Sequence, residues 1–197
     1  QTVNANTLNK IDQRYVQQLR SITGVEASYG VVIGSGEARF LDGNTAGIQV
    51  IGSDAPEYII GPHPSKIYEG NLSDLALPEA VSAEFFNASS WGTDLYLNKA
   101  IEINGKSALI KVITKQAQAF GGNYMYTSLN NARYYGNVAS SSVSLIAVRL
   151  NNSKDNILVT YQRNGVEYQT EIKLYLEDSE YKTGLYVRDM IRGVATL

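Results

Sequence analysis

Apolar and polar residues alternate along residues 100–113, and the alternation is interrupted once, at Asn104-Gly105. Both residues tolerate the positive φ that a type I′ turn requires, so the pattern predicts a hairpin with a two-residue loop. This loop length places all the apolar residues of both strands on one face. That face comprises Ile101, Ile103, Ala108, Ile110 and Val112, and the opposite face Glu102, Ser107 and Lys111. We therefore expect one buried and one solvated face.

A period of three to four residues marks the N-terminal part of the chain. The apolar positions that repeat in this way are Leu8, Ile11, Tyr15, Leu19 and Ile22. They predict a long helix, which Thr7 can cap and after which Gly24 can adopt a left-handed conformation. A helix packed on a sheet fits this stripe, and so does a coiled-coil stalk that continues from upstream.

Most of the remaining chain shows the period of two that is typical of strands. Strands are predicted in residues 25–34, 45–52, 123–128 and 140–150, and a second Asn-Gly hairpin turns at Asn164-Gly165. Residues 53–66 contain three of the four prolines and are expected to form a loop or edge segment, and residues 129–136 a helical turn. The fold class expected is α+β, with mixed, mainly antiparallel sheets, a long N-terminal helix and two lobes.

Composition restricts the classes of function that the chain can have. The formal net charge of the 197 residues is -2 and the basic residues are scattered, which argues against a nucleic-acid partner or an anionic membrane surface. The chain has no cysteine, so disulfides and thiolate nucleophiles are excluded. No apolar run is long enough to span a bilayer, and the first residues do not form a signal peptide. We expect an excised piece of a longer protein, whose membrane segments lie outside it.

Residues that carry out chemistry are scarce. His63, the only histidine, lies between two prolines, and no nucleophile motif accompanies it. The acidic cluster of Glu177, Asp178 and Glu180 is typical of a solvated turn, and the G-x-G at 34–36 favours a turn over a nucleotide site. The sequence predicts no catalytic residue, no metal site and no cofactor, and gives no case for an enzyme.

Six segments, in order, bear a resemblance to a known family. They are "YVQQLRSITGVEASYG", "IQVIGSDAPEY", "IYEGNLSDLALPEAVSAEFF", "WGTDLYLNKAIEINGKSALIKVI", "AFGGNYMYTSLNNARYY" and "VSLIAVRL". Together they resemble the MacB-like periplasmic core domain of ABC exporter permeases, the MacB/FtsX family, and particularly its DevC-type branch, over residues 10–150. One departure is that "KVITK" lacks the glycine that usually follows the hairpin.

The resemblance implies an α+β extracytoplasmic domain between two membrane helices, in the periplasm or at the cell surface, without catalytic residues. It would couple ATP-driven motion to export and contact the membrane helices of the parent permease, an adaptor or exported substrate and, indirectly, a cytoplasmic ATPase. The domains expected are a membrane-proximal lobe with the N-terminal helix (1–60), an inserted β-rich distal lobe (61–142) and returning strands with a C-terminal hairpin (143–197).

The tail, residues 157–197, resembles a different family. Its "KTGLYVRDMIRGVATL" is similar to the junction between the PDZ domain and the peptidase of the stage-four sporulation signalling serine peptidase. The matched positions include Gly184, Leu185, Tyr186, Val187, Arg188, Asp189, Gly193 and Thr196. A fragment of such a peptidase, and a secreted binding or adhesion module, are the alternatives to the permease domain.

The partner-binding residues expected are those of the glycine-bracketed "AFGGNYMY" segment. Exposed aromatic residues on a mobile loop suit recognition, and these are Phe120, Gly121, Gly122, Tyr124 and Tyr126. Packing of the three aromatic side chains into the core is the alternative.

Overall fold

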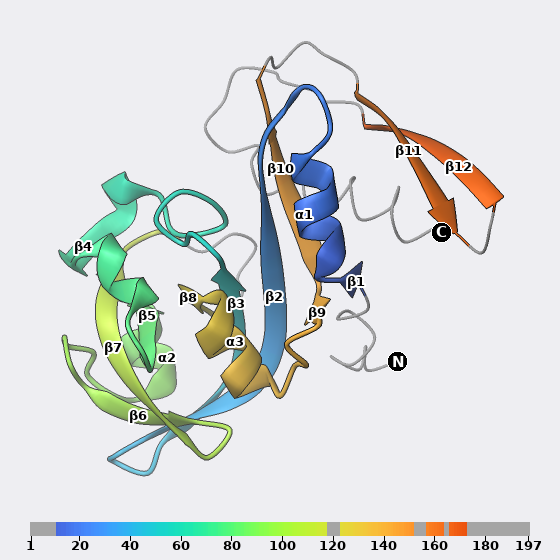
Figure 1. The fold of residues 1–197 in the computed structure, drawn as a ribbon. Coiled ribbons are helices and arrows are strands. Elements are labelled where there is room, and N and C mark those ends of the chain that lie inside the picture. The colour runs from blue at the N-terminus through green and yellow to red at the C-terminus, as the bar shows by residue number, and fades with distance from the viewer. Residues whose placement is uncertain (1–10, 118–122, 152–156, 164–165, 173–197) are drawn as a thin grey trace.

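The computed structural model describes residues 11–117, 123–151, 157–163 and 166–172 (Figure 1). In chain order the elements are β1 (Ile11–Asp12), α1 (Arg14–Arg20), β2 (Val25–Phe40), β3 (Thr45–Ser53), the 3-10 helix η2 (Pro64–Lys66), β4 (Ile67–Gly70), the 3-10 helix η3 (Leu72–Ala76), β5 (Ala80–Glu84), α2 (Asn87–Trp91), β6 (Ala100–Ile103), β7 (Lys106–Thr114), β8 (Tyr124–Ser128), α3 (Leu129–Gly136), β9 (Ser142–Val143), β10 (Leu145–Leu150), β11 (Ile157–Arg163) and β12 (Val166–Ile172). None of the helices in these residues is long and apolar enough to cross a bilayer.

An eight-stranded mixed sheet organises the fold. Its path runs β4-β7-β6-β2-β3-β8, and β10 joins β2 while β5 joins β7. The β3–β8 and β5–β7 pairs are parallel and the other pairs of this sheet are antiparallel. This confirms the α+β class with mixed, mainly antiparallel sheets.

The sheet curls until β8 lies beside β5 (Figure 1). Side chains hold these two strands together: the N–H of Tyr126 donates to Oγ of Ser82 at 2.8 Å, and Oγ1 of Thr127 donates to the carbonyl of Ala80. Strands β5, β7, β6, β2, β3 and β8 thus surround one apolar interior. We call this ring of six strands the barrel.

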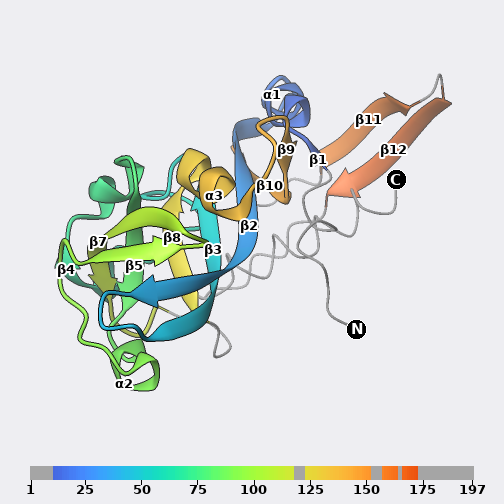
Figure 2. The same cartoon turned by 90° about the horizontal axis from the view of Figure 1, so that it is seen from below.

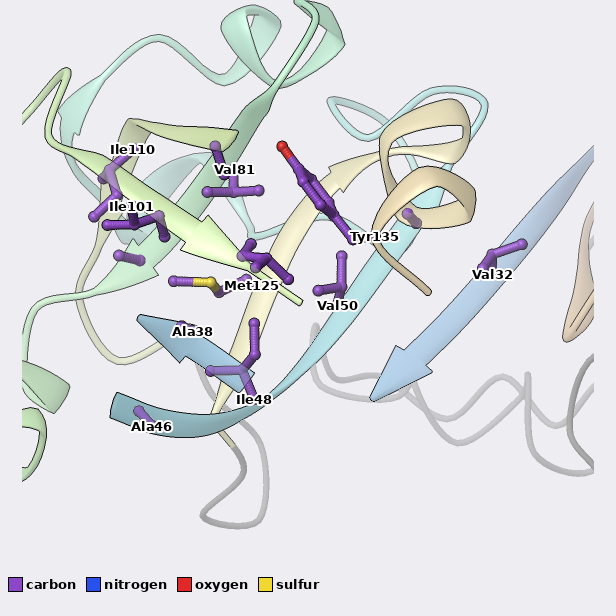
Figure 3. Packing of buried hydrophobic residues seen from close by; sticks show 14 of the residues in the cluster. Val32, Ala38, Ala46, Ile48, Val50, Val81, Ile101, Ile110, Met125 and Tyr135 are labelled. Atoms are coloured by element: carbon purple, nitrogen blue, oxygen red, sulfur yellow. The ribbon is translucent and has the colours of Figure 1, made fainter. Parts of the chain in front are cut away.

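The interior of the barrel is filled from every side. Figure 3 shows Val81, Ile101, Ile110, Met125 and Val50 from five different strands converging on one another. Tyr135 of α3 is also fully buried, and its hydroxyl donates to the carbonyls of Glu79 and Ser107, both at 3.1 Å. A second, smaller apolar cluster covers the outer face of β2 and β10, where Val31, Leu145 and Ala147 pack against Ile59 and Ile60 of the loop that follows β3.

The hairpin of residues 100–113 forms as predicted. Asn104 and Gly105 have φ of 51° and 74°, and Ile103 pairs with Lys106 across the two-residue turn. All five residues of the predicted apolar face are buried. The second hairpin agrees in its strands, because β11 and β12 pair antiparallel with Arg163 opposite Val166, whereas its turn lies outside the described residues.

The predicted long N-terminal helix is wrong. α1 has seven residues, and Ile11 belongs instead to β1, where it pairs with Val143. The carboxylate of Asp12 then accepts the N–H of Arg14 at 2.9 Å, where the helix begins. Gly24 does adopt a positive φ of 93°, four residues after the helix ends, while Thr7 and Leu8 lie outside the described residues.

The turn predicted at the G-x-G of residues 34–36 is also wrong. These residues continue β2, a strand of 16 residues, and pair with Ile48–Val50 of β3. The glycine at 34 has a packing reason, since a Cβ there would lie 3.1 Å from the Cα of Gly136 on α3. The lack of a side chain allows α3 to pack closely on β2. The domain boundaries at residues 60 and 142 stay a prediction.

Candidate interaction surface

The predicted partner-binding residues fall partly outside the described chain. Phe120, Gly121 and Gly122 are among the residues that the structure does not describe, whereas Tyr124 and Tyr126 lie on β8. The strand period places both tyrosines on the outer face and Met125 in the core, and both tyrosines are half-buried. The structure therefore brings the two tyrosines together, and the binding role remains a prediction.

The chain that leads to residues 118–122 is anchored by a buried carboxylate. Oε1 of Glu84 accepts the N–H of Gln116 at 2.8 Å, and Oε2 accepts the N–H of Ala117 at 3.1 Å and the hydroxyl of Thr114 at 2.9 Å. Three donors compensate for burying the charge of Glu84. They also hold Gln116 at a positive φ of 62°, which fixes the direction in which the chain leaves β7.

Tyr126 anchors the same point from β8. Its hydroxyl donates to the carbonyl of Ala117 at 3.1 Å. Burial, together with the neighbouring Tyr124 and Glu84, raises the pKa of Tyr126 to about 12. The phenol therefore stays protonated at neutral pH and remains a donor. The side chains of Glu84 and Tyr126 thus bind both the N–H and the carbonyl of Ala117.

Beside this anchor lies a group of exposed aromatic residues. Tyr68 and Phe85 have ring centroids 5.0 Å apart, and Phe85 and Phe86 have theirs 5.6 Å apart in an edge-on arrangement. The Nζ of Lys115 lies 4.9 Å from the centroids of Tyr68 and Phe85 and 5.6 Å from that of Phe86. We call Tyr68, Phe85, Phe86 and Lys115 the aromatic patch.

Strand register explains why these four residues meet. Thr114 pairs with Ile67 on β4 and with Glu84 on β5, so β5 and β7 end beside the start of β4. Ala83 and Ile113 face the core, so Glu84 and Thr114 lie on the opposite face of the sheet, where both are nevertheless buried. Tyr68, Phe85 and Lys115 each directly follow one of the three paired residues, and their rings and ammonium group meet on one surface. Sequence reasoning missed this patch, although "FF" directly after a strand was a visible signal.

Lys115 differs from Lys106, which also lies over an exposed ring. Lys106 lies 4.5 Å from the ring of Tyr134, and its Nζ also donates to Oδ1 of Asn137 at 2.6 Å. Within the described residues, by contrast, the Nζ of Lys115 contacts the three rings and has no hydrogen-bond acceptor or ion-pair partner. Its charge is thus available to an outside group.

None of the residues that the sequence offers as candidates for catalysis belongs to the aromatic patch. His63 is exposed on the loop before η2, where its Nδ1 accepts the N–H of Ser65 at 3.2 Å and lies 2.7 Å from the Ser65 hydroxyl oxygen. The acidic cluster of residues 177–180 lies outside the described residues, as does the peptidase-like stretch 184–196. In the part of the chain that the structure describes, no three His, Asp or Glu side chains could together hold a metal ion.

A second polar arrangement joins the barrel to the N-terminal helix. Arg133 of α3 donates through its guanidinium to Oε1 of Gln13 at 2.6 Å, directly before α1, and to the carbonyl of Ser142 on β9 at 3.1 Å. Burial lowers the pKa of Arg133, which nevertheless stays charged at physiological pH. One side chain thus links α3 and β9 to the residue before α1, which lies 120 positions away from Arg133.

Solved structures provide the comparison with known proteins. No protein-family model and no curated protein matches the sequence. The extracellular domain of the noncanonic ABC-type transporter YknZ from Gram-positive bacteria aligns with a TM-score of 0.55 and 16% identity, over 76% of this chain and 77% of that one. The periplasmic region of MacB from Actinobacillus actinomycetemcomitans aligns with a TM-score of 0.56 and 11% identity, over 75% of this chain and 68% of that one. The chain therefore has the fold of these two extracytoplasmic transporter domains.

Proposed function

We propose that this chain is the extracytoplasmic domain of an ABC-type transporter permease, at the outer face of a bacterial cell membrane. The fold that it has in common with the YknZ and MacB domains is the observation that carries the proposal. In this role the domain catalyses no reaction. It passes motion, driven by ATP on the cytoplasmic side, to an exported substrate or to a periplasmic partner.

The shape of β2 supports a mechanical role. Its 16 residues span about 50 Å at the usual rise of a strand. The first half of β2 pairs with β10 beside α1, and the second half pairs with β3 and β6 in the barrel (Figures 1 and 2). One continuous strand therefore connects the α1 end with the barrel, and a displacement at one end moves the other.

The proposal also gives the orientation of the domain relative to the membrane. The end with α1, β1 and β10 would face the membrane helices of the permease, and the barrel would point away from them. The cytoplasmic ATPase would act on the domain through those helices only. Partner contacts would then be made by the barrel, where Tyr124, Tyr126 and the aromatic patch lie.

Cysteine labelling tests the location directly, because the chain has no cysteine of its own. Leu41 is 78% exposed in the β2–β3 turn, so Leu41→Cys in the parent protein should react with a membrane-impermeant maleimide in intact cells. Ala38→Cys, which is buried in the neighbouring strand, is the matched control and should react only after denaturation. Protection of Leu41→Cys until the cells are lysed would contradict the proposal.

A further inference from the structure

We propose that the aromatic patch binds an acidic peptide segment of a partner protein, with an apolar side chain against the rings and a carboxylate on the Nζ of Lys115. This inference builds on the proposed function, since it names the partner chemistry of a barrel surface. The patch consists of Tyr68 in β4, Phe85 and Phe86 directly after β5, and Lys115 directly after β7.

The three aromatic rings of the patch form a contiguous exposed surface. Tyr68, Phe85 and Phe86 are 48%, 37% and 55% exposed, and their rings contact one another. Contiguous exposed aromatic surface on a soluble domain is typical of a protein contact, and aromatic residues dominate the energy of such contacts. The rings already pack in tilted and edge-on geometries, so a ligand would add to an ordered surface.

The charge comes from Lys115. Its ammonium group is attracted to the faces of three rings, and no described carboxylate neutralises it. A partner that buries the rings also removes water from this ammonium, which is costly without a counter-charge. A carboxylate on the partner supplies that counter-charge. A purely apolar or basic segment would leave the ammonium unpaired, so an acidic segment fits best.

Rigidity below the patch favours binding. Lys115 lies between Thr114, which donates to Glu84, and Gln116, whose N–H donates to the same carboxylate. The N–H of Phe85 donates to the carbonyl of Thr114 at 2.8 Å, and the N–H of Lys115 to the carbonyl of Lys66 at 2.8 Å. The backbones that carry the patch are thus fixed, which reduces the entropy lost on binding.

The position of the patch favours a protein over a lipid surface. In Figures 1 and 2, β4, β5 and β7 lie on the side of the barrel away from α1 and β10. Under the proposed function α1 and β10 face the membrane, so the patch points away from it. A soluble or adaptor protein can reach that side, whereas the bilayer of the parent permease cannot.

Fluorescence anisotropy with the full 197-residue chain tests this inference. The probe is a labelled peptide of alternating Glu and Leu, and its controls carry Gln or Lys in place of Glu. We expect binding of the Glu peptide that weakens with added NaCl. Phe86→Ala and Lys115→Met should each weaken binding at least about fivefold, whereas Lys115→Arg should retain it.

Tyr134→Ala provides the matched variant, because Tyr134 is 52% exposed, also lies under a lysine and belongs to α3 outside the patch. It should bind the Glu peptide like the parent chain. Circular dichroism and urea unfolding of each variant confirm that the fold is kept. Equal binding by all variants, preference for the Lys peptide, or no binding of the Glu peptide would overturn the inference.

Vesicles of phosphatidylglycerol and phosphatidylcholine provide the remaining arm of the test. Vesicle binding that depends on Phe86 and Lys115, without peptide binding, would assign the patch to a membrane and overturn the inference. The labelling of Leu41→Cys separates this result from the proposed function. If Leu41→Cys is labelled from outside the cell but the Glu peptide does not bind, only the assignment of the patch is overturned. If Leu41→Cys is protected but the Glu peptide binds, only the proposed location is overturned.

Discussion

The guanidinium of Arg133 donates to the side-chain oxygen of Gln13 at 2.6 Å, across 120 residues of sequence. Arg133 follows the strand that closes the barrel, and Gln13 directly precedes α1. Their contact is therefore a joint between the barrel and the N-terminal helix. The same guanidinium also donates to the carbonyl of Ser142, so its removal leaves two acceptors without a donor.

Arg133→Met should lower the free energy of unfolding by about 1–3 kcal/mol, the usual cost of leaving partly buried polar groups unpaired. Urea unfolding followed by circular dichroism measures this. Arg39→Met is the control, because Arg39 is exposed and its ion pair with Glu37 is long, at 3.9 Å. Equal losses in both variants would show that Arg133 is not a joint.

The contact of α3 with β3 depends on a glycine. A Cβ at Gly52 would lie 2.3 Å from the carbonyl oxygen of Ser128 and 2.5 Å from the Cβ of Ala132. Gly52→Ala must therefore displace α3 and should cost about 1–3 kcal/mol or more in the free energy of unfolding. Gly47→Ala on the same strand meets no atom within 4 Å and should be neutral or slightly stabilising. Thermal or urea unfolding of the pair would reveal the difference.

Local signals were sufficient for the hairpin and for most strands. Asn104-Gly105 determines its own turn, and the alternation around it determines which side chains are buried. The short α1 was not predictable in this way, because Ile11 is fixed by pairing with Val143, which lies far from it in sequence. Apolar spacing before residue 14 fits a helix and a strand edge alike.

The aromatic patch could not be predicted from local signals either, because it depends on pairing between distant strands. Phe85 and Phe86 are visible as a pair in the sequence, but Tyr68 and Lys115 join them only through the pairing of β7 with both β4 and β5. The β5–β7 pair is parallel, so no local turn indicates its register. Similarly, the glycine at 34 looks like a turn signal until α3 is seen packed against it.

Alkaline pH should destabilise the chain through Tyr126. The pKa of Tyr126 is raised from 10.0 to about 12 in the folded state, chiefly by burial. Below pH 10 both the folded and the unfolded chain hold the proton, and the stabilising contribution is complete. Between pH 10 and about 12 the unfolded chain loses the proton first, so stability falls, by roughly 3 kcal/mol in all. Tyr126→Phe should lose less over this range, as measured by urea unfolding at each pH. Parallel losses in both proteins would assign the effect to other tyrosines.

Export by the parent permease should depend on the aromatic residues Phe120 and Tyr124. Replacing Phe120 and Tyr124 with Ala should impair export of the substrate while the chain keeps its fold, because aromatic contacts carry most of the energy of such interfaces. Tyr124 is half-buried on the outer face of β8, so its loss should leave the core intact. Tyr134→Ala, on α3, is the control and should export normally. Unchanged export by the double variant would remove Phe120 and Tyr124 from the contact surface and leave the aromatic patch as the candidate.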